Sequence, residues 1–228
     1  MINNILEKKS YGVEYQPFIS TKNKEVMAYE ALSRFSDKNI TPDMFFTICH
    51  NFPDLFFKAE QILKSYQFLN RPKNKKLFVN FDPHVFLEKD KVNEVFSLFN
   101  KQENFVIELV ENSHEMINTK TLLQIFDKLH YDFAIDDFFK ENSMLSIQLL
   151  NKCDYLKLDM DVLKEMNNNK SFSSIVEGLV KFSHSLDKKV VLEGVEVQSD
   201  FELAKELKID LVQGFLFKSQ FIKKMNYD

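Results

Sequence analysis

Short runs of strand-forming residues alternate with longer stretches in which apolar residues recur at helical spacing, along most of the chain. The runs fall at residues 11–18, 25–32, 77–81, 105–110, 133–138, 155–158, 189–192 and 211–217. Strands that alternate with helices favour a parallel sheet with right-handed crossovers. About eight such units in 228 residues predict an α/β fold, a (β/α)8 barrel of the TIM type.

We expect one domain, residues 1–228, with a short polar lead-in over residues 1–10. A polar turn at residues 20–24 joins the first two runs, which are expected to pair as a hairpin. Helices are expected within residues 41–69, broken at Pro53, and over residues 92–100, 118–130, 172–186 and 201–207. The 24 phenylalanines supply a core large enough for this plan.

The charge balance argues against several classes of partner. With 30 basic and 34 acidic residues the net charge is −4, which disfavours a general electrostatic grip on DNA, RNA or an anionic membrane. Cys49 and Cys153 lack the spacing of a metal site or a disulfide framework, and the five histidines show no ligand spacing. Because no signal-like start or long apolar span is present, we expect a cytoplasmic protein that does not enter a membrane.

The run Phe133–Phe138 contains two adjacent carboxylates, Asp136 and Asp137. Neighbouring strand residues point to opposite faces, so the pair serves one site only where the strand gives way to a loop, which is where an α/β barrel places its chemistry. Two carboxylates about 4 Å apart repel by about 4 kcal/mol at an effective dielectric constant near 20, so they favour a bound cation. The alternative is that the pair caps a following helix.

Unusual polar residues occupy seven otherwise apolar strand runs, or the positions just beyond them. Buried charged residues need partners, and the strand ends of a closed barrel converge on one mouth. Hard oxygen ligands in this number suit Mg²⁺ or Mn²⁺, in one or two ions, better than zinc. The residues are Glu30, Asn80, Glu108, Asp136, Asp137, Lys157, Glu193 and Gln213.

Eight short segments also stand out as motifs. They are Tyr15–Phe18 (YQPF), Tyr29–Arg34 (YEALSR), Val79–Asn80 (VN), Glu108–Glu111 (ELVE), Ile135–Phe138 (IDDF), Leu156–Asp159 (LKLD), Glu193–Glu196 (EGVE) and Gln213–Phe215 (QGF). In this order they resemble the signature of the bacterial EAL-domain cyclic di-GMP phosphodiesterases. The resemblance covers nearly the whole chain and implies a modified barrel whose first strand runs antiparallel to the others.

The resemblance implies roles for single residues at the centre of the site. Asp137 matches the residue that bridges toward a second metal ion, and Glu193 matches a metal-associated glutamate sometimes assigned as general base. Lys157 matches the lysine that orients the attacking water. The positions that match ligands of one metal ion are Glu30, Asn80, Glu108 and Asp136.

Other matched residues lie around that centre. Gln16 and Arg34 match positions that contact the ligand, and Gln213 matches an amide close to water or metal. Arginine suits a phosphate because its planar guanidinium donates two parallel hydrogen bonds. Glu111 and Glu196 match residues that hold the neighbouring loop. Taken singly, these are ordinary surface or loop residues, so the assignments depend on the whole motif set.

One segment departs from the family pattern. The family has a glycine after Asp-Asp-Phe and a second glycine soon afterwards, whereas residues 139–144 here read FKENSM. Because glycine supplies positive φ and close backbone approach, we expect this loop to follow another path. In the family the loop couples dimerisation to metal binding and to closure over the substrate.

From the resemblance we expect a phosphodiesterase that opens cyclic di-GMP to linear pGpG in bacterial second-messenger signalling. Mg²⁺ or Mn²⁺, as two ions, is the expected cofactor, a homodimer the expected assembly, and Lys157, Glu193 and Asp137 the expected catalytic residues. The altered loop supports an alternative, a member that holds cyclic di-GMP or a protein partner without hydrolysing it. A scaffold without a ligand is the weaker alternative, since it has no need of converging carboxylates.

Overall fold

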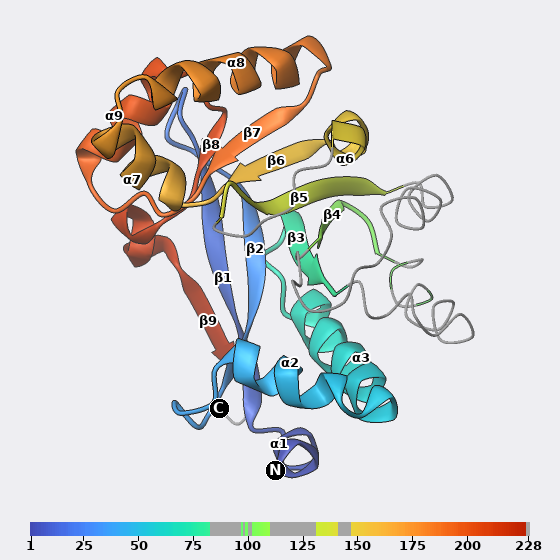
Figure 1. Cartoon of the computed structure of the whole chain (residues 1–228). Helices are drawn as coiled ribbons and strands as arrows, with labels where there is room; N and C mark the ends of the chain where they lie inside the picture. The colour runs from blue at the N-terminus through green and yellow to red at the C-terminus, as the bar shows by residue number, and fades with distance from the viewer. Residues whose placement is uncertain (83–96, 98, 100–101, 110–130, 141–146, 227–228) are drawn as a thin grey trace.

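A computed structural model describes residues 1–82, 97, 99, 102–109, 131–140 and 147–226 of the chain. Within these residues nine strands form one sheet, in the order β2-β3-β4-β5-β6-β7-β8-β1-β9 (Figure 1). The strands are β1 (Tyr11–Ser20), β2 (Val26–Phe35), β3 (Lys76–Phe81), β4 (Phe105–Leu109), β5 (Asp132–Phe138), β6 (Tyr155–Leu158), β7 (Lys189–Leu192), β8 (Leu211–Val212) and β9 (Ile222–Met225).

The first strand closes the sheet into a barrel. Neighbours from β2 to β8 are parallel, whereas β1 is antiparallel to β2 on one side and to β8 on the other. The hairpin places Gln16 directly opposite Glu30, and Ile19 pairs with Val212 of β8. The expected eight-stranded barrel with an antiparallel first strand is confirmed.

Helices pack around the outside of the barrel. Figure 1 shows α3 beside the β1–β2 hairpin and α8 next to β7. The Thr41 hydroxyl accepts a hydrogen bond from the Met44 amide at the start of α2, and Pro53 begins α3, so the predicted break is confirmed. The described helices are α1 (Ile2–Glu7), α2 (Pro42–His50), α3 (Pro53–Leu69), α6 (Ile147–Lys152), α7 (Asp161–Asn168), α8 (Phe172–Ser185) and α9 (Gln198–Glu206).

The last predicted strand, residues 211–217, is wrong beyond Val212. The chain leaves the sheet at Gly214, where a Cβ would lie 2.1 Å from the carbonyl oxygen of Val195, and a 3-10 helix, η2 (Phe215–Gln220), follows. Helix α7 and strand β9 were not predicted. The helices expected over residues 92–100 and 118–130 lie outside the described residues, apart from the helical Ser97 and Phe99.

Apolar side chains from alternate strand positions form a floor inside the barrel. Phe18 and Phe78 meet edge to face there, with ring centroids 4.6 Å apart. The floor consists of Phe18, Ala28, Phe78, Val106, Ala134, Val191 and Leu211, with Tyr155 packed against it. None of the described helices is long and apolar enough to cross a bilayer.

Candidate functional site

Each of seven strands has a polar residue, within the strand or just beyond its end, two positions after a floor residue or after Tyr155, which packs against the floor. Side chains at i and i+2 share a face of a strand, so the polar residues form a second layer above the floor, at the carboxyl ends of the strands. The pairs are Ala28 with Glu30, Phe78 with Asn80, Val106 with Glu108, Ala134 with Asp136, Tyr155 with Lys157, Val191 with Glu193, and Leu211 with Gln213.

This polar layer borders a cavity of about 820 Å³. That volume lies within the usual range for a small-molecule site. Glu108 lies beneath the cavity and is fully buried. Predicted site residues that line the cavity are Gln16, Glu30, Asn80, Asp136, Asp137, Lys157, Glu193, Glu196 and Gln213.

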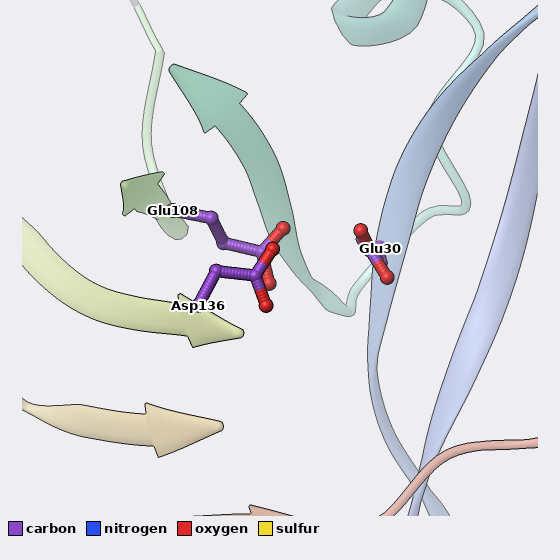
Figure 2. Close-up of side chains that lie close together, drawn as sticks. All are labelled: Glu30, Glu108 and Asp136. Carbon is purple, nitrogen blue, oxygen red and sulfur yellow. The ribbon is translucent and has the colours of Figure 1, made fainter. Parts of the chain in front are cut away.

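Two groups of three carboxylates meet in this layer. Glu30, Glu108 and Asp136 each place an oxygen within 4.8 Å of the other two, and Asp136, Asp137 and Glu193 do the same. Figure 2 shows the first group, with side chains from β2, β4 and β5 directed toward one another. Because Asp136 belongs to both groups, the arrangement suits two neighbouring divalent cations held by oxygen ligands.

Backbone geometry explains how two adjacent aspartates serve one site. Asp137 has φ of 54°, a left-handed conformation, and the pairing of β5 with β6 shifts between Ile135 and Phe138. The strict alternation of faces is therefore interrupted where the two carboxylates stand. Both residues lie inside β5, so the helix-cap alternative is wrong.

The ammonium of Lys157 lies among the carboxylates. Its Nζ is 2.7 Å from Glu108 Oε1, 2.7 Å from Asp136 Oδ1, 2.8 Å from Glu193 Oε1 and 3.8 Å from Glu30 Oε1. Burial alone would lower the pKa of Lys157, but the surrounding carboxylates raise it well above its ordinary value. Lys157 is therefore a fixed positive charge at the centre of the site.

Acidic groups around Lys157 hold protons more tightly than usual. Burial, together with the charge of Glu30, raises the pKa of Glu108 well above its ordinary value. Burial and the charge of Asp136 raise the pKa of Asp137, and burial raises that of Glu193 to about 8 against the opposing effect of Lys157. Glu108 Oε2 accepts no hydrogen bond from the described residues. Such excess negative charge and an orphaned oxygen fit a site for cations.

Amide side chains orient Glu30. Gln213 Nε2 lies 2.6 Å from Glu30 Oε2 and donates to it, and Asn80 Nδ2 donates to Glu30 Oε1 across 3.1 Å. Gln213 also donates to Gln16 Oε1 at 3.3 Å. The contacts join β1, β2, β3 and the end of β8, so they fix the carboxylate from both sides of the barrel seam.

The remaining predicted residues lie outside the two carboxylate groups. Arg34 Nη2 pairs with Glu14 Oε1 at 2.7 Å, and Arg34 is not among the residues that line the cavity. Gln16 Nε2 donates to the same Glu14 oxygen. Glu196 is exposed at the cavity wall, and Glu111 lies outside the described residues.

Sequence reasoning missed a polar wall that α2, α3 and the end of β3 contribute to the cavity. Its members include Glu60, Lys64 and Gln67 of α3, all buried. His50, interpreted from sequence as an ordinary residue, places Nε2 2.6 Å from Asp82 Oδ2 on this wall. The available signal was a Glu–Lys pair four residues apart on the apolar stripe of a helix, where charged residues are rare.

The loop after the aspartate pair begins with a strained residue. Phe139, at the position of the family's first glycine, has φ of 73°. The backbone thus adopts the left-handed conformation that glycine favours. The ring packs against Phe138 and Phe172, with centroids 4.7 Å and 5.6 Å apart. Residues 141–146 of the loop lie outside the described residues.

Comparisons with known proteins find relatives that match most of the chain. MucR of Pseudomonas aeruginosa, a bifunctional diguanylate cyclase and cyclic di-GMP phosphodiesterase, is 24% identical over 94% of this chain, which spans 34% of MucR. A MucR phosphodiesterase structure with cyclic di-GMP matches with a TM-score of 0.77 at 23% identity, covering 94% of this chain and 93% of that one.

A second structural relative is BlrP1 of Klebsiella pneumoniae, solved with manganese and cyclic di-GMP. It matches with a TM-score of 0.73 at 22% identity, over 91% of this chain and 55% of that one. At these identities the likeness to both structures shows the fold. The family model described as EAL domain matches residues 1–220. The chain therefore belongs to the EAL domain family.

Proposed function

We propose that this chain is a metal-dependent phosphodiesterase that hydrolyses cyclic di-GMP to linear pGpG in bacterial signalling. The observation that carries the proposal is the pair of carboxylate groups that share Asp136 inside one cavity. Family membership and the cyclic di-GMP named for the MucR and BlrP1 structures support the substrate. A single domain, a homodimer and a cytoplasmic location are parts of this proposal that rest on the family resemblance and composition.

Two ions, Mg²⁺ or Mn²⁺, fit the two groups. Asp136 would bind both ions, and the Asn80 amide adds a neutral oxygen near Glu30. Ions bound there would supply Lewis acidity that offsets phosphoryl charge and lowers the pKa of water. The ligands unique to one ion would be Glu30 and Glu108, and those unique to the other Asp137 and Glu193.

The chain's own residues would then position and deprotonate water. Lys157 offers its ammonium to the water oxygen, and Glu193 accepts a proton. A P–O bond forms from water while the P–O3′ bond breaks, and the departing 3′ oxygen takes up a proton, which leaves a 5′ phosphate on pGpG. Gln16 and Gln213 lie where they can contact the dinucleotide, and Arg34 would have to exchange its Glu14 partner for a phosphate.

Hydrolysis of cyclic di-GMP by the purified chain tests the proposal directly. Product should appear with Mg²⁺ or Mn²⁺, disappear with EDTA, and be detected as pGpG by chromatography. Asp136→Asn should abolish turnover while the variant keeps its circular dichroism spectrum. Absence of product from metal-saturated, folded wild-type protein would overturn the proposal.

A binding module is the second candidate. It is favoured by the position of Lys157, whose ammonium already compensates the carboxylates, and by the strained Phe139 beside them. A receptor of this kind would bind cyclic di-GMP equally well with EDTA and return it unchanged. Metal-dependent turnover would exclude this candidate.

A further inference from the structure

The cavity continues beyond the metal-type carboxylates to the wall on α3. Glu60, Lys64 and Gln67 line it there, with only 1%, 3% and 3% of their surface exposed. Glu60 belongs to neither carboxylate group of the metal site. A buried carboxylate and a buried ammonium beside a cavity therefore form a second polar site, separate from the place of hydrolysis.

This second site has spare hydrogen-bonding capacity. Lys64 Nζ stands 3.4 Å from Glu60 Oε1 and 3.3 Å from Glu60 Oε2, a loose pair. Glu60 Oε2 and Gln67 Oε1 accept no hydrogen bond from any described residue. Buried acceptors without a hydrogen bond are uncommon in folded proteins. Gln67 Oε1 lacks one, and Glu60 Oε2 has only the loose ion pair with Lys64, so both oxygens can accept a hydrogen bond from a ligand.

The chemistry of the pair fits one nucleobase edge. A carboxylate offers two parallel acceptors, which match the N1–H and N2–H₂ donors that guanine presents side by side, and an ammonium matches the acceptors O6 and N7. Adenine presents an acceptor at N1 and would face Glu60 unfavourably. The ring of Phe46 lines the same cavity and offers an apolar face for stacking.

We propose that Glu60 and Lys64 form a specificity subsite that reads one guanine of the dinucleotide. The inference rests on the proposed function and deepens it, because it assigns selection of the base to α3 and cleavage to the barrel mouth. The His50–Asp82 contact of 2.6 Å joins α2 to the residue just beyond β3, and both residues line the cavity with this subsite.

Removal of one donor from the ligand tests the subsite without altering the protein. Cyclic di-IMP keeps O6, N7 and N1–H but lacks the 2-amino group. Calorimetric titrations with Ca²⁺, followed by chromatography to confirm intact dinucleotide, should show wild-type protein binding cyclic di-GMP at least tenfold more tightly than cyclic di-IMP. Equal affinities would overturn the assignment.

Two variants locate the selectivity. Glu60→Gln should remove most of the difference in affinity between cyclic di-GMP and cyclic di-IMP. Lys64→Gln should weaken the binding of both dinucleotides about equally, since both carry O6 and N7. The control Glu177→Gln, on the exposed side of α8, should behave as wild type. Unchanged Mn²⁺ binding by each variant shows that the barrel has folded, and a Glu60→Gln protein that binds Mn²⁺ yet keeps the guanine preference contradicts the proposal.

The same titrations separate the two proposals. Guanine-selective binding by wild-type protein that hydrolyses nothing would overturn the proposed function and leave the subsite intact. If the wild-type protein hydrolyses cyclic di-GMP but binds cyclic di-GMP and cyclic di-IMP equally well, the proposed function stands and the subsite is overturned.

Discussion

Lys157 and Asp136 face each other across adjacent strands, with Nζ 2.7 Å from Oδ1 and the lysine 1% exposed. The lysine also pairs with Glu108 and Glu193, so one ammonium partly neutralises the charge of several carboxylates at the mouth of the barrel. Among the described residues, the Lys157 ammonium is the cation in contact with these carboxylates, so it offsets their mutual repulsion when no metal is bound. We therefore expect stability and metal binding to be coupled through Lys157.

Lys157→Met should destabilise metal-free protein by about 3 kcal/mol, because it leaves buried carboxylates without their cation. Saturating Mn²⁺ should restore much of that loss by replacing the charge. Urea unfolding of both proteins, with EDTA and with Mn²⁺, measures the effect. The control Lys189→Met removes an exposed partner of Asp210 and should cost less than about 1 kcal/mol. Equal losses with and without metal would contradict the coupling.

Metal stoichiometry should follow the overlap of the two carboxylate groups. We expect two Mn²⁺ per wild-type chain, one strongly bound ion for Glu108→Gln or Asp137→Asn, and weakening of both sites for Asp136→Asn by more than about tenfold. Calorimetry with Mn²⁺ provides the measurement. The control Glu25→Gln lies in the exposed β1–β2 turn and should bind as wild type. Asp136→Asn that loses a single ion would show that the groups are independent.

Phe139 offers a measurement of backbone strain. Both Phe139→Ala and Phe139→Gly lose the ring contacts with Phe138 and Phe172, but only glycine relieves φ of 73°. The glycine variant should therefore be the more stable of the two by about 1 kcal/mol. Asn169 serves as the control, because its φ of −137° strains no side chain. There Asn169→Ala should be more stable than Asn169→Gly. Denaturant unfolding of the four variants decides, and a more stable alanine at position 139 would rule out strain.

Both thiols should be unreactive in the folded protein. Burial raises the pKa of Cys49 to about 12 and that of Cys153 to about 11, so little thiolate exists at pH 8. Labelling with a chromogenic disulfide should be slow in buffer and should reach two thiols promptly in guanidinium chloride. Rapid labelling of either cysteine in buffer would show that its surroundings open readily.

Asp210 should contribute stability that acid removes. Burial alone would raise the pKa of Asp210, but hydrogen bonds from Lys189, the Val190 amide and His184 hold it below its ordinary value. Asp210 therefore stabilises the fold at any pH above its pKa in the unfolded protein. This stabilisation is lost as the pH falls through the lower pKa that Asp210 has in the folded protein. Asp210→Asn should cost about 1–2 kcal/mol at pH 7 and progressively less below pH 4. A pH-independent cost in urea unfolding would contradict this account.

Much of the site was predictable because charges inside apolar strands stand out. Glu108 and Lys157 interrupt runs that are otherwise buried, and the floor residues two positions earlier fix the face on which they point. The same alternation could not foretell that Asp137 shares a site with Asp136, because a local left-handed φ decides it.

Other features depend on contacts distant in sequence. The last predicted strand stops at Val212 because Gly214 crosses the backbone of Val195, which sequence patterns do not reveal. Glu60 and Lys64 read as an ordinary helical ion pair until packing places them on the cavity. Helix α7 is short and polar, so its apolar stripe carried too little signal.

Strand β1 lies between β2 and β8, and Gln213, just beyond β8, reaches back to Glu30 across 183 residues. The ribosome synthesises β8 after β2 to β7, so one edge of β1 lacks its partner while those strands are made. An open edge can pair with foreign strands, and contacts this distant in sequence form slowly. Closure of the seam therefore completes the barrel and the cavity at its mouth together.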